Sequence, residues 1–82
     1  KYFSITVKAL KIAKKKINKK YKQQAEIILD MAERYFNDAK YFEKQNNYVN
    51  AFGALNYAHG WLDTGSKLGI FNVKDSRLFV VK

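Results

Sequence analysis

The 82-residue sequence contains no cysteine, no proline and a single histidine. Without cysteine, the chain forms no disulfide and offers no thiolate to a metal. Without proline, nothing covalent interrupts a helix, so long helices are favoured. No run of about 18 uncharged apolar residues is present, which argues against a membrane span. The lysine-rich start does not resemble a signal peptide, and we expect a cytoplasmic protein.

Acidic residues are missing from the first quarter of the chain. Residues 1–22 hold nine lysines and no acid, whereas residues 23–82 hold seven basic and seven acidic residues. The whole net charge of +9 therefore lies in residues 1–22. Such an asymmetry indicates a partner of opposite charge and says nothing about the fold.

Apolar periodicity predicts three helices in one small domain. Phe3, Leu10 and Ile17 recur every seven residues, with lysines on the opposite side, which predicts a first helix over about 4–20. A second helix is expected over about 23–45. Its apolar face consists of Ala25, Ile28, Leu29, Ala32, Tyr35, Phe36, Ala39 and Phe42.

The third predicted helix, about 48–68, is apolar over more than half of its circumference, so we expect it to pack against two neighbours. Asn46 and Asn47 separate it from the second helix. Asn tolerates the left-handed conformation that ends a helix and also caps helix starts. So short a connection predicts an antiparallel hairpin. The core should include Ile28, Ala32, Tyr35, Ala39, Leu55, Ala58 and Leu62.

Residues 70–82 lose the helical period. Phe79-Val80-Val81 is β-prone, but no second clear strand is available to pair with it. We therefore predict a non-helical tail that lies across the bundle. The fold class is all-α: a three-helix bundle whose second and third helices form an antiparallel hairpin.

Two strings of residues carry a family resemblance. Tyr35-Phe36-Asn37-Asp38-Ala39-Lys40-Tyr41-Phe42 is followed by a short turn and by Tyr57-Ala58-His59-Gly60-Trp61-Leu62-Asp63, with Leu68-Gly69 beyond. This pattern resembles the short archaeal family called domain of unknown function 357, except that Asn46-Asn47 replaces the Gly-Asp of the family turn. The resemblance implies a three-helix bundle and no particular activity, and it assigns no functional residue.

The candidate catalytic residues are few. Asp38 and Asp63 would suit general acid–base chemistry if they converged in a cleft, and His59 is the one histidine. No metal site follows from one histidine without a cluster of acids or thiols. We favour packing roles for all three residues. We expect no enzymatic activity, no catalytic residue, no metal and no cofactor.

Gly53 and Gly60 lie one heptad apart in the third predicted helix. Each costs up to about 1 kcal/mol relative to alanine, so something should offset that cost. Close approach of another helix or of the tail is the favoured explanation. An open groove for a partner is the alternative.

The lysines of the first predicted helix are the strongest signal outside the core. The candidate polyanion-binding residues are Lys8, Lys11, Lys15, Lys19 and Lys22. We interpret the chain as an interaction module with an unidentified protein partner. The alternative is weak, sequence-nonspecific binding of nucleic acid or the ribosome through this lysine face, since lysine contacts phosphates and reads no base pattern. Binding to an anionic membrane surface is a third hypothesis.

Overall fold

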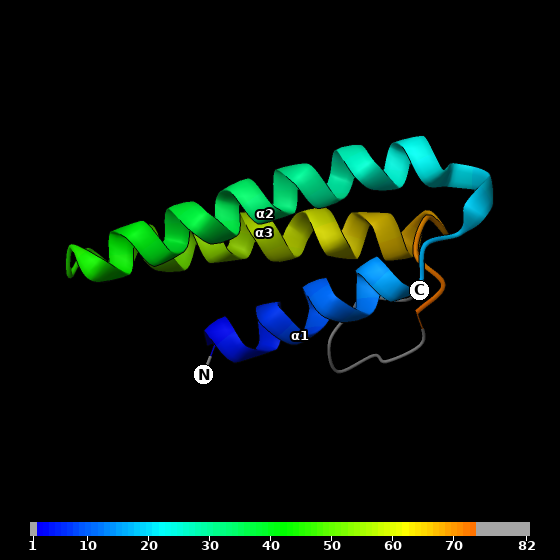
Figure 1. Cartoon of the computed structure of the whole chain (residues 1–82). Coiled ribbons are helices and arrows are strands. Elements are labelled where there is room, and N and C mark those ends of the chain that lie inside the picture. Colours follow the sequence, from blue (N-terminus) through cyan, green and yellow to red (C-terminus); the bar gives the residue numbers. More distant parts are fainter. Residues whose placement is uncertain (1, 74–82) are drawn as a thin grey trace.

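A computed structural model describes residues 2–73, and the predicted β-prone stretch 79–81 lies outside them. The described chain forms three α-helices and one 3₁₀ turn (Figure 1). In chain order these are α1 (Tyr2–Lys15), η1 (Lys19–Tyr21), α2 (Lys22–Lys44) and α3 (Tyr48–Lys67). The predicted all-α three-helix bundle is therefore confirmed.

The turn between α2 and α3 forms as the two asparagines predict. Asn46 has a φ of 57°, the left-handed conformation that ends α2. The Asn47 side chain accepts a hydrogen bond of 3.3 Å from the backbone N–H of Asn50 and so caps α3. The two helices consequently run antiparallel and side by side, as Figure 1 shows.

Small buried residues at heptad spacing line the helices of the hairpin. On α2 these are Ala25, Ala32 and Ala39, and on α3 they are Ala51, Ala58 and Gly65. With so little side chain between them, two helices can approach closely. The larger core residues Ile28, Leu55 and Leu62 are buried as predicted, whereas Tyr35 is only half-buried. Phe52 of α3 is 47% exposed.

The first helix ends at Lys15, five residues earlier than predicted. Residues 16–18 instead pair with the chain that returns after α3. Ile17 forms an antiparallel bridge with Phe71. The Asn18 N–H donates to the carbonyl of Ile70 at 2.8 Å, and the Asn72 N–H donates to that of Lys16 at 2.7 Å. The helix stops because these backbone groups find partners outside it.

The described start of the tail, residues 70–73, is non-helical, and its first two residues are buried. Gly69, at a φ of 77°, ends α3 and turns the chain. The Phe71 ring then lies so close to Gly65 that a Cβ there would overlap it. Within residues 70–73 the tail packs on the bundle as predicted.

None of the helices that the structure describes is both long enough and apolar enough to cross a membrane.

The cap at Asn47 yields the first prediction. Replacing Asn47 by alanine removes the acceptor of the Asn50 N–H and should lower the free energy of unfolding by about 0.5–2 kcal/mol. Urea denaturation followed by circular dichroism measures this change. Asn37→Ala, at an exposed position inside α2, is the matched control and should change stability little. Equal stability of the Asn47 variant and the wild type would contradict the capping role.

Candidate functional site

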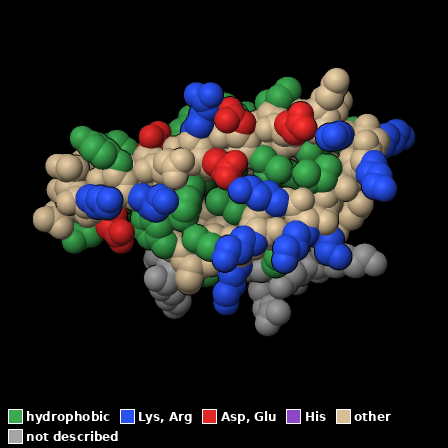
Figure 2. All heavy atoms as spheres, viewed as in Figure 1, with side chains coloured by type: hydrophobic (Ala, Val, Ile, Leu, Met, Phe, Trp, Pro, Cys, Tyr) green, Lys and Arg blue, Asp and Glu red, His purple; other side chains and the backbone are tan. Residues whose placement is uncertain are grey.

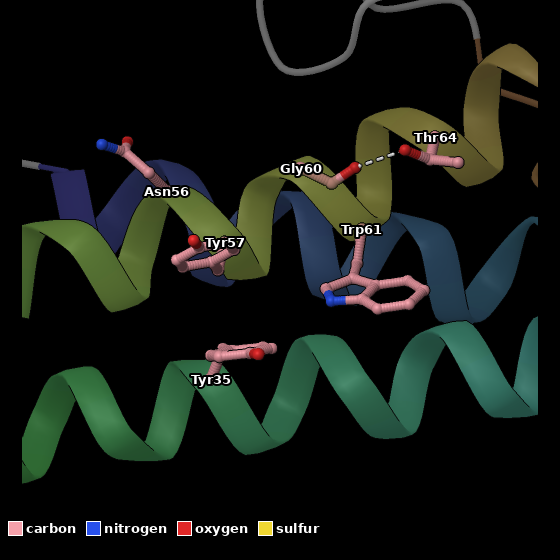
Figure 3. A pocket seen from close by; sticks show the side chains of 6 residues that line it. All are labelled: Tyr35, Asn56, Tyr57, Gly60, Trp61 and Thr64. Atoms are coloured by element: carbon pink, nitrogen blue, oxygen red, sulfur yellow. Dashed lines mark hydrogen bonds between the residues drawn. The ribbon is translucent and has the colours of Figure 1, made fainter.

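One side of the α2–α3 hairpin is covered by α1 and the opposite side is not. On the covered side, Val7 and Leu10 of α1 lie beside Phe36 of α2. In Figure 3 the view is onto the uncovered side, and α1 lies behind the hairpin. We call this side the open face. It is formed by Tyr35, Asp38 and Phe42 of α2 and by Asn50, Gly53, Tyr57, Gly60, Trp61 and Thr64 of α3.

A stacked pair of tyrosines divides the open face near its middle. The rings of Tyr35 and Tyr57 are 5.2 Å apart between centroids, with an interplanar angle of 23°. Figure 3 shows the two rings facing one another across the gap between α2 and α3. Tyr57 is 64% exposed although it is part of an aromatic stack. The pair thus presents an aromatic surface to solvent.

A hollow lies on each side of this pair. The first, the base hollow, has a volume of about 380 Å³ and lies toward the end of α3, where Gly60, Trp61 and Thr64 line it. The second, the tip hollow, has a volume of about 310 Å³ and lies toward the Asn46–Asn47 turn. Both hollows are open to solvent and mainly apolar. Each has room for a large side chain from another molecule.

Two helical glycines keep the hollows open. A Cβ built at Gly53 or Gly60 meets no described atom within 4 Å. The predicted close approach of another helix at these glycines is therefore not found, and the part of that prediction that concerns the tail beyond residue 73 lies outside the described residues. The physical reason is that α1 packs on the other side of the hairpin, so nothing described covers them. The alternative, an open groove, agrees with the geometry.

The open face is nearly free of charge. Among the residues that line the two hollows, Asp38 is the one charged side chain. Five of the seven acidic residues are in α2, and most of them lie outside this lining. Aromatic and small residues account for most of the remaining lining. Such a composition differs sharply from that of the lysine-rich side of the molecule.

Asp38, His59 and Asp63 do not converge. Asp38 is exposed and lines the tip hollow. His59 is half-buried on the other side of α3, where it lines a hollow with Ile5 and Thr6 of α1. Its Nε2 lies 3.8 Å from Oδ1 of Asp63, one helical turn further along α3. Within residues 2–73, no group of three histidine or acidic side chains is arranged to hold a metal ion.

The predicted polyanion-binding lysines are all exposed but do not share one helix. Lys8, Lys11 and Lys15 are in α1, where Lys11 also lines the hollow between α1 and α2, whereas Lys19 is in η1 and Lys22 begins α2. Figure 2 shows basic side chains gathered over α1 and the segment that follows, with acidic side chains mainly over α2. Lys14 pairs with Glu33 of α2 at 2.6 Å. We call Lys8, Lys11 and Lys15 the α1 lysines.

The sequence predicts the open face only through the alternative explanation of Gly53 and Gly60, an open groove for a partner. Tyr35 lies on an apolar stripe and is predicted as a core residue, although it lines this face. The signal that distinguishes the open face from the core is the pair of glycines one heptad apart, Gly53 and Gly60. Glycines inside a helix with nothing packed against them indicate a surface that must remain free of side chains.

The three glycines of α3 yield the second prediction. Gly53→Ala and Gly60→Ala should each raise the free energy of unfolding by up to about 1 kcal/mol, because alanine favours the helix and its methyl group enters open space. Gly65→Ala is the matched control, and it should lower stability because its methyl group meets the Phe71 ring. Urea denaturation of the three variants measures both effects. Destabilisation by all three would show that the open face is covered.

Comparison with known proteins agrees with the fold and names no activity. No curated protein and no solved structure matches the chain significantly. The sequence profile of one family, described as protein of unknown function (DUF357), matches residues 1–71. That span contains all three helices and the turn of the hairpin. The chain therefore belongs to the DUF357 family.

Proposed function

We propose that this protein is a helical interaction module rather than an enzyme, and that it binds another protein chain through the open face. The observation that carries the proposal is the pair of open, apolar hollows beside the Tyr35–Tyr57 stack. Asp38 lies at the tip hollow, away from the His59–Asp63 pair on the other side of α3, so the three candidate catalytic residues form no common cleft that would support acid–base chemistry.

The chemistry of the open face is that of protein interfaces. Tyrosine and tryptophan supply most of the binding energy at many interfaces, usually in pockets that a partner covers. Exposed apolar surface rimmed by polar residues marks such sites. Here Tyr57 and Trp61 lie beside the hollows, and Asn50 and Thr64 lie at their outer ends. Apolar burial would therefore provide the affinity, and the polar residues would fix the register.

The third prediction tests this surface by affinity capture from native lysate. A variant with both Gly53→Lys and Gly60→Lys places a long charged side chain in each hollow, with room to do so, and should lose the captured protein. Asn37→Lys adds a lysine at an exposed position of α2 outside the open face and should retain it. Nuclease treatment should leave the capture unchanged. Equal capture by the wild type and the double-glycine variant would refute the proposal.

A second candidate function is weak, sequence-nonspecific binding of nucleic acid or the ribosome. The observation that favours it is the exposure of Lys8, Lys11 and Lys15 along one side of α1, in a segment without any acidic residue. Glu33 pairs with Lys14, and the three lysines are exposed, with Lys11 at the rim of the hollow that Glu33 also lines. Binding to phosphate groups would relieve the electrostatic repulsion among these three lysines.

The fourth prediction concerns the salt dependence of this binding. The slope of log K against log salt should be about −0.7 to −0.9 per phosphate neutralised. Changing the three α1 lysines together to glutamine should reduce the slope by the contribution of about three phosphate contacts. The affinity should not depend on the sequence of the nucleic acid. Fluorescence anisotropy on two unrelated oligonucleotides measures both properties.

The control for this experiment is a second triple lysine-to-glutamine variant, which loses the same amount of charge at positions outside α1. Lys40, Lys44 and Lys67 are exposed on α2 and α3, and their replacement by glutamine should change the slope much less. An equal loss of slope in both triple variants would mean that binding follows net charge alone. Absence of binding at about 50 mM salt would rule out the nucleic-acid hypothesis.

A further inference from the structure

We propose that the open face binds a second copy of this chain, so that two hairpins pack face to face in a symmetric dimer. In this dimer the two α3 helices run antiparallel, with Tyr57 of each copy near the two-fold axis. The α1 helix of each copy lies on the outside. This inference rests on the proposed function, because it identifies the chain that covers the open face.

The first argument is the symmetry of α3 about Tyr57. Gly53 and Trp61 lie four residues before and after Tyr57, and Asn50 and Thr64 lie seven residues before and after it. At 1.5 Å per residue these offsets are about 6 and 10.5 Å along the helix axis. A two-fold axis at Tyr57 that reverses the helix direction therefore brings Trp61 opposite Gly53 of the second copy.

This two-fold arrangement places the large side chain of Trp61 over the tip hollow of the second copy. Trp61 is half-buried, because part of its side chain packs against the core of its own copy while the rest lines the base hollow. In the dimer the exposed part of the indole faces the tip hollow of the second copy, which Gly53 keeps open. A bulky residue opposite a small one is how helix surfaces interdigitate. The symmetry repeats the contact, so each tip hollow is covered by a tryptophan.

The polar residues at the ends of the face are complementary under the same operation. Asn50 of one copy comes opposite Thr64 of the other. The Thr64 hydroxyl donates to the carbonyl of Gly60 at 2.8 Å, so its oxygen retains the capacity to accept. The side-chain amide of Asn50 can supply that hydrogen bond. These contacts would favour the antiparallel register over a shifted one.

The second argument is area. The open face extends from Asn50 to Thr64, about 22 Å along α3, and two adjacent helices are about 20 Å wide, which gives a footprint of roughly 450 Å². Two such faces bury about 900 Å² in total, the size of small and transient interfaces. The dimer is therefore weak, and we expect a dissociation constant in the upper micromolar range, about 100 μM.

The third argument is charge. The net charge of +9 lies in residues 1–22, and the α1 lysines lie on the side of the hairpin away from the open face. Face-to-face packing therefore keeps the two lysine-rich sides apart. Asp38 lies three residues beyond Tyr35, so the two Asp38 carboxylates are offset by about 9 Å along the helix axis. The one charged side chain that lines the hollows therefore does not meet its symmetry copy.

The fifth prediction begins with sedimentation equilibrium of the wild-type protein. The apparent mass should rise from 9.6 kDa toward twice that value as the concentration rises through about 100 μM. The variant with both Gly53→Lys and Gly60→Lys should remain monomeric at concentrations at least tenfold higher. Asn37→Lys should dimerise like the wild type. A wild-type protein that is monomeric at all concentrations would overturn the inference.

The absence of cysteine from the chain allows a direct test of register. When the Asn50→Cys and Thr64→Cys variants are mixed under mild oxidation, a disulfide should form between one variant and the other, because the two positions face one another across the dimer. Each protein alone should cross-link poorly, since equivalent positions are about 21 Å apart along the axis. Preferential cross-linking of either protein with itself would refute the proposed register.

The two tests separate this inference from the proposed function. If the wild type is monomeric and the double-glycine variant still loses a captured protein, the open face binds a different chain and only the dimer is wrong. If the wild type is monomeric and capture is unaffected by that variant, both proposals fail.

Discussion

The close packing of α2 against α3 is the constraint on which the rest of the molecule depends. Ala25, Ala32 and Ala39 occur at heptad spacing on α2, and Ala51, Ala58 and Gly65 do so on α3. Because these side chains are small, the larger residues must flank the interface on one side or the other. Leu55 and Leu62 face α1 and the start of the tail, while Tyr57 and Trp61 lie on the opposite side. The hairpin therefore has two apolar flanks, and one short helix covers only one of them.

Much of this fold follows from local features of the sequence. The bounds of α2 and α3 agree with the predicted ones to within one residue, because Asn46 and Asn47 determine the turn through their own conformational preferences. The end of α1 is different. It depends on pairing of residues 16–18 with residues 70–72, more than fifty positions away. No local preference at Lys15 carries that information, so periodicity extended the helix too far.

The candidate site was predictable only in part, because it too depends on contacts between segments that are far apart in the sequence. Exposure of the lysines follows from their charge and required no knowledge of packing. The open face depends on which flank of the hairpin α1 covers, and both flanks are apolar. Tyr35 and Trp61 are therefore indistinguishable from core residues in the sequence. Gly53 and Gly60 are the residues that distinguish the two flanks, because within residues 2–73 nothing packs against them.

The lysine-rich surface and the open face lie on opposite sides of the hairpin, and this separation has a consequence for how the molecule can associate. A domain of this size buries a smaller fraction of its surface on folding than a larger domain does, and it has little stability to spare. Within residues 2–73 the aromatic flank is uncovered and two helical glycines have nothing packed against them, which lowers that stability further. Burial of the flank by a partner would recover part of it. The lysines lie on the other side of the molecule, where they keep the charged surface hydrated and apart from the apolar one. The molecule can therefore associate through one face while the opposite face remains free to meet an anionic partner, because neither contact requires the other surface.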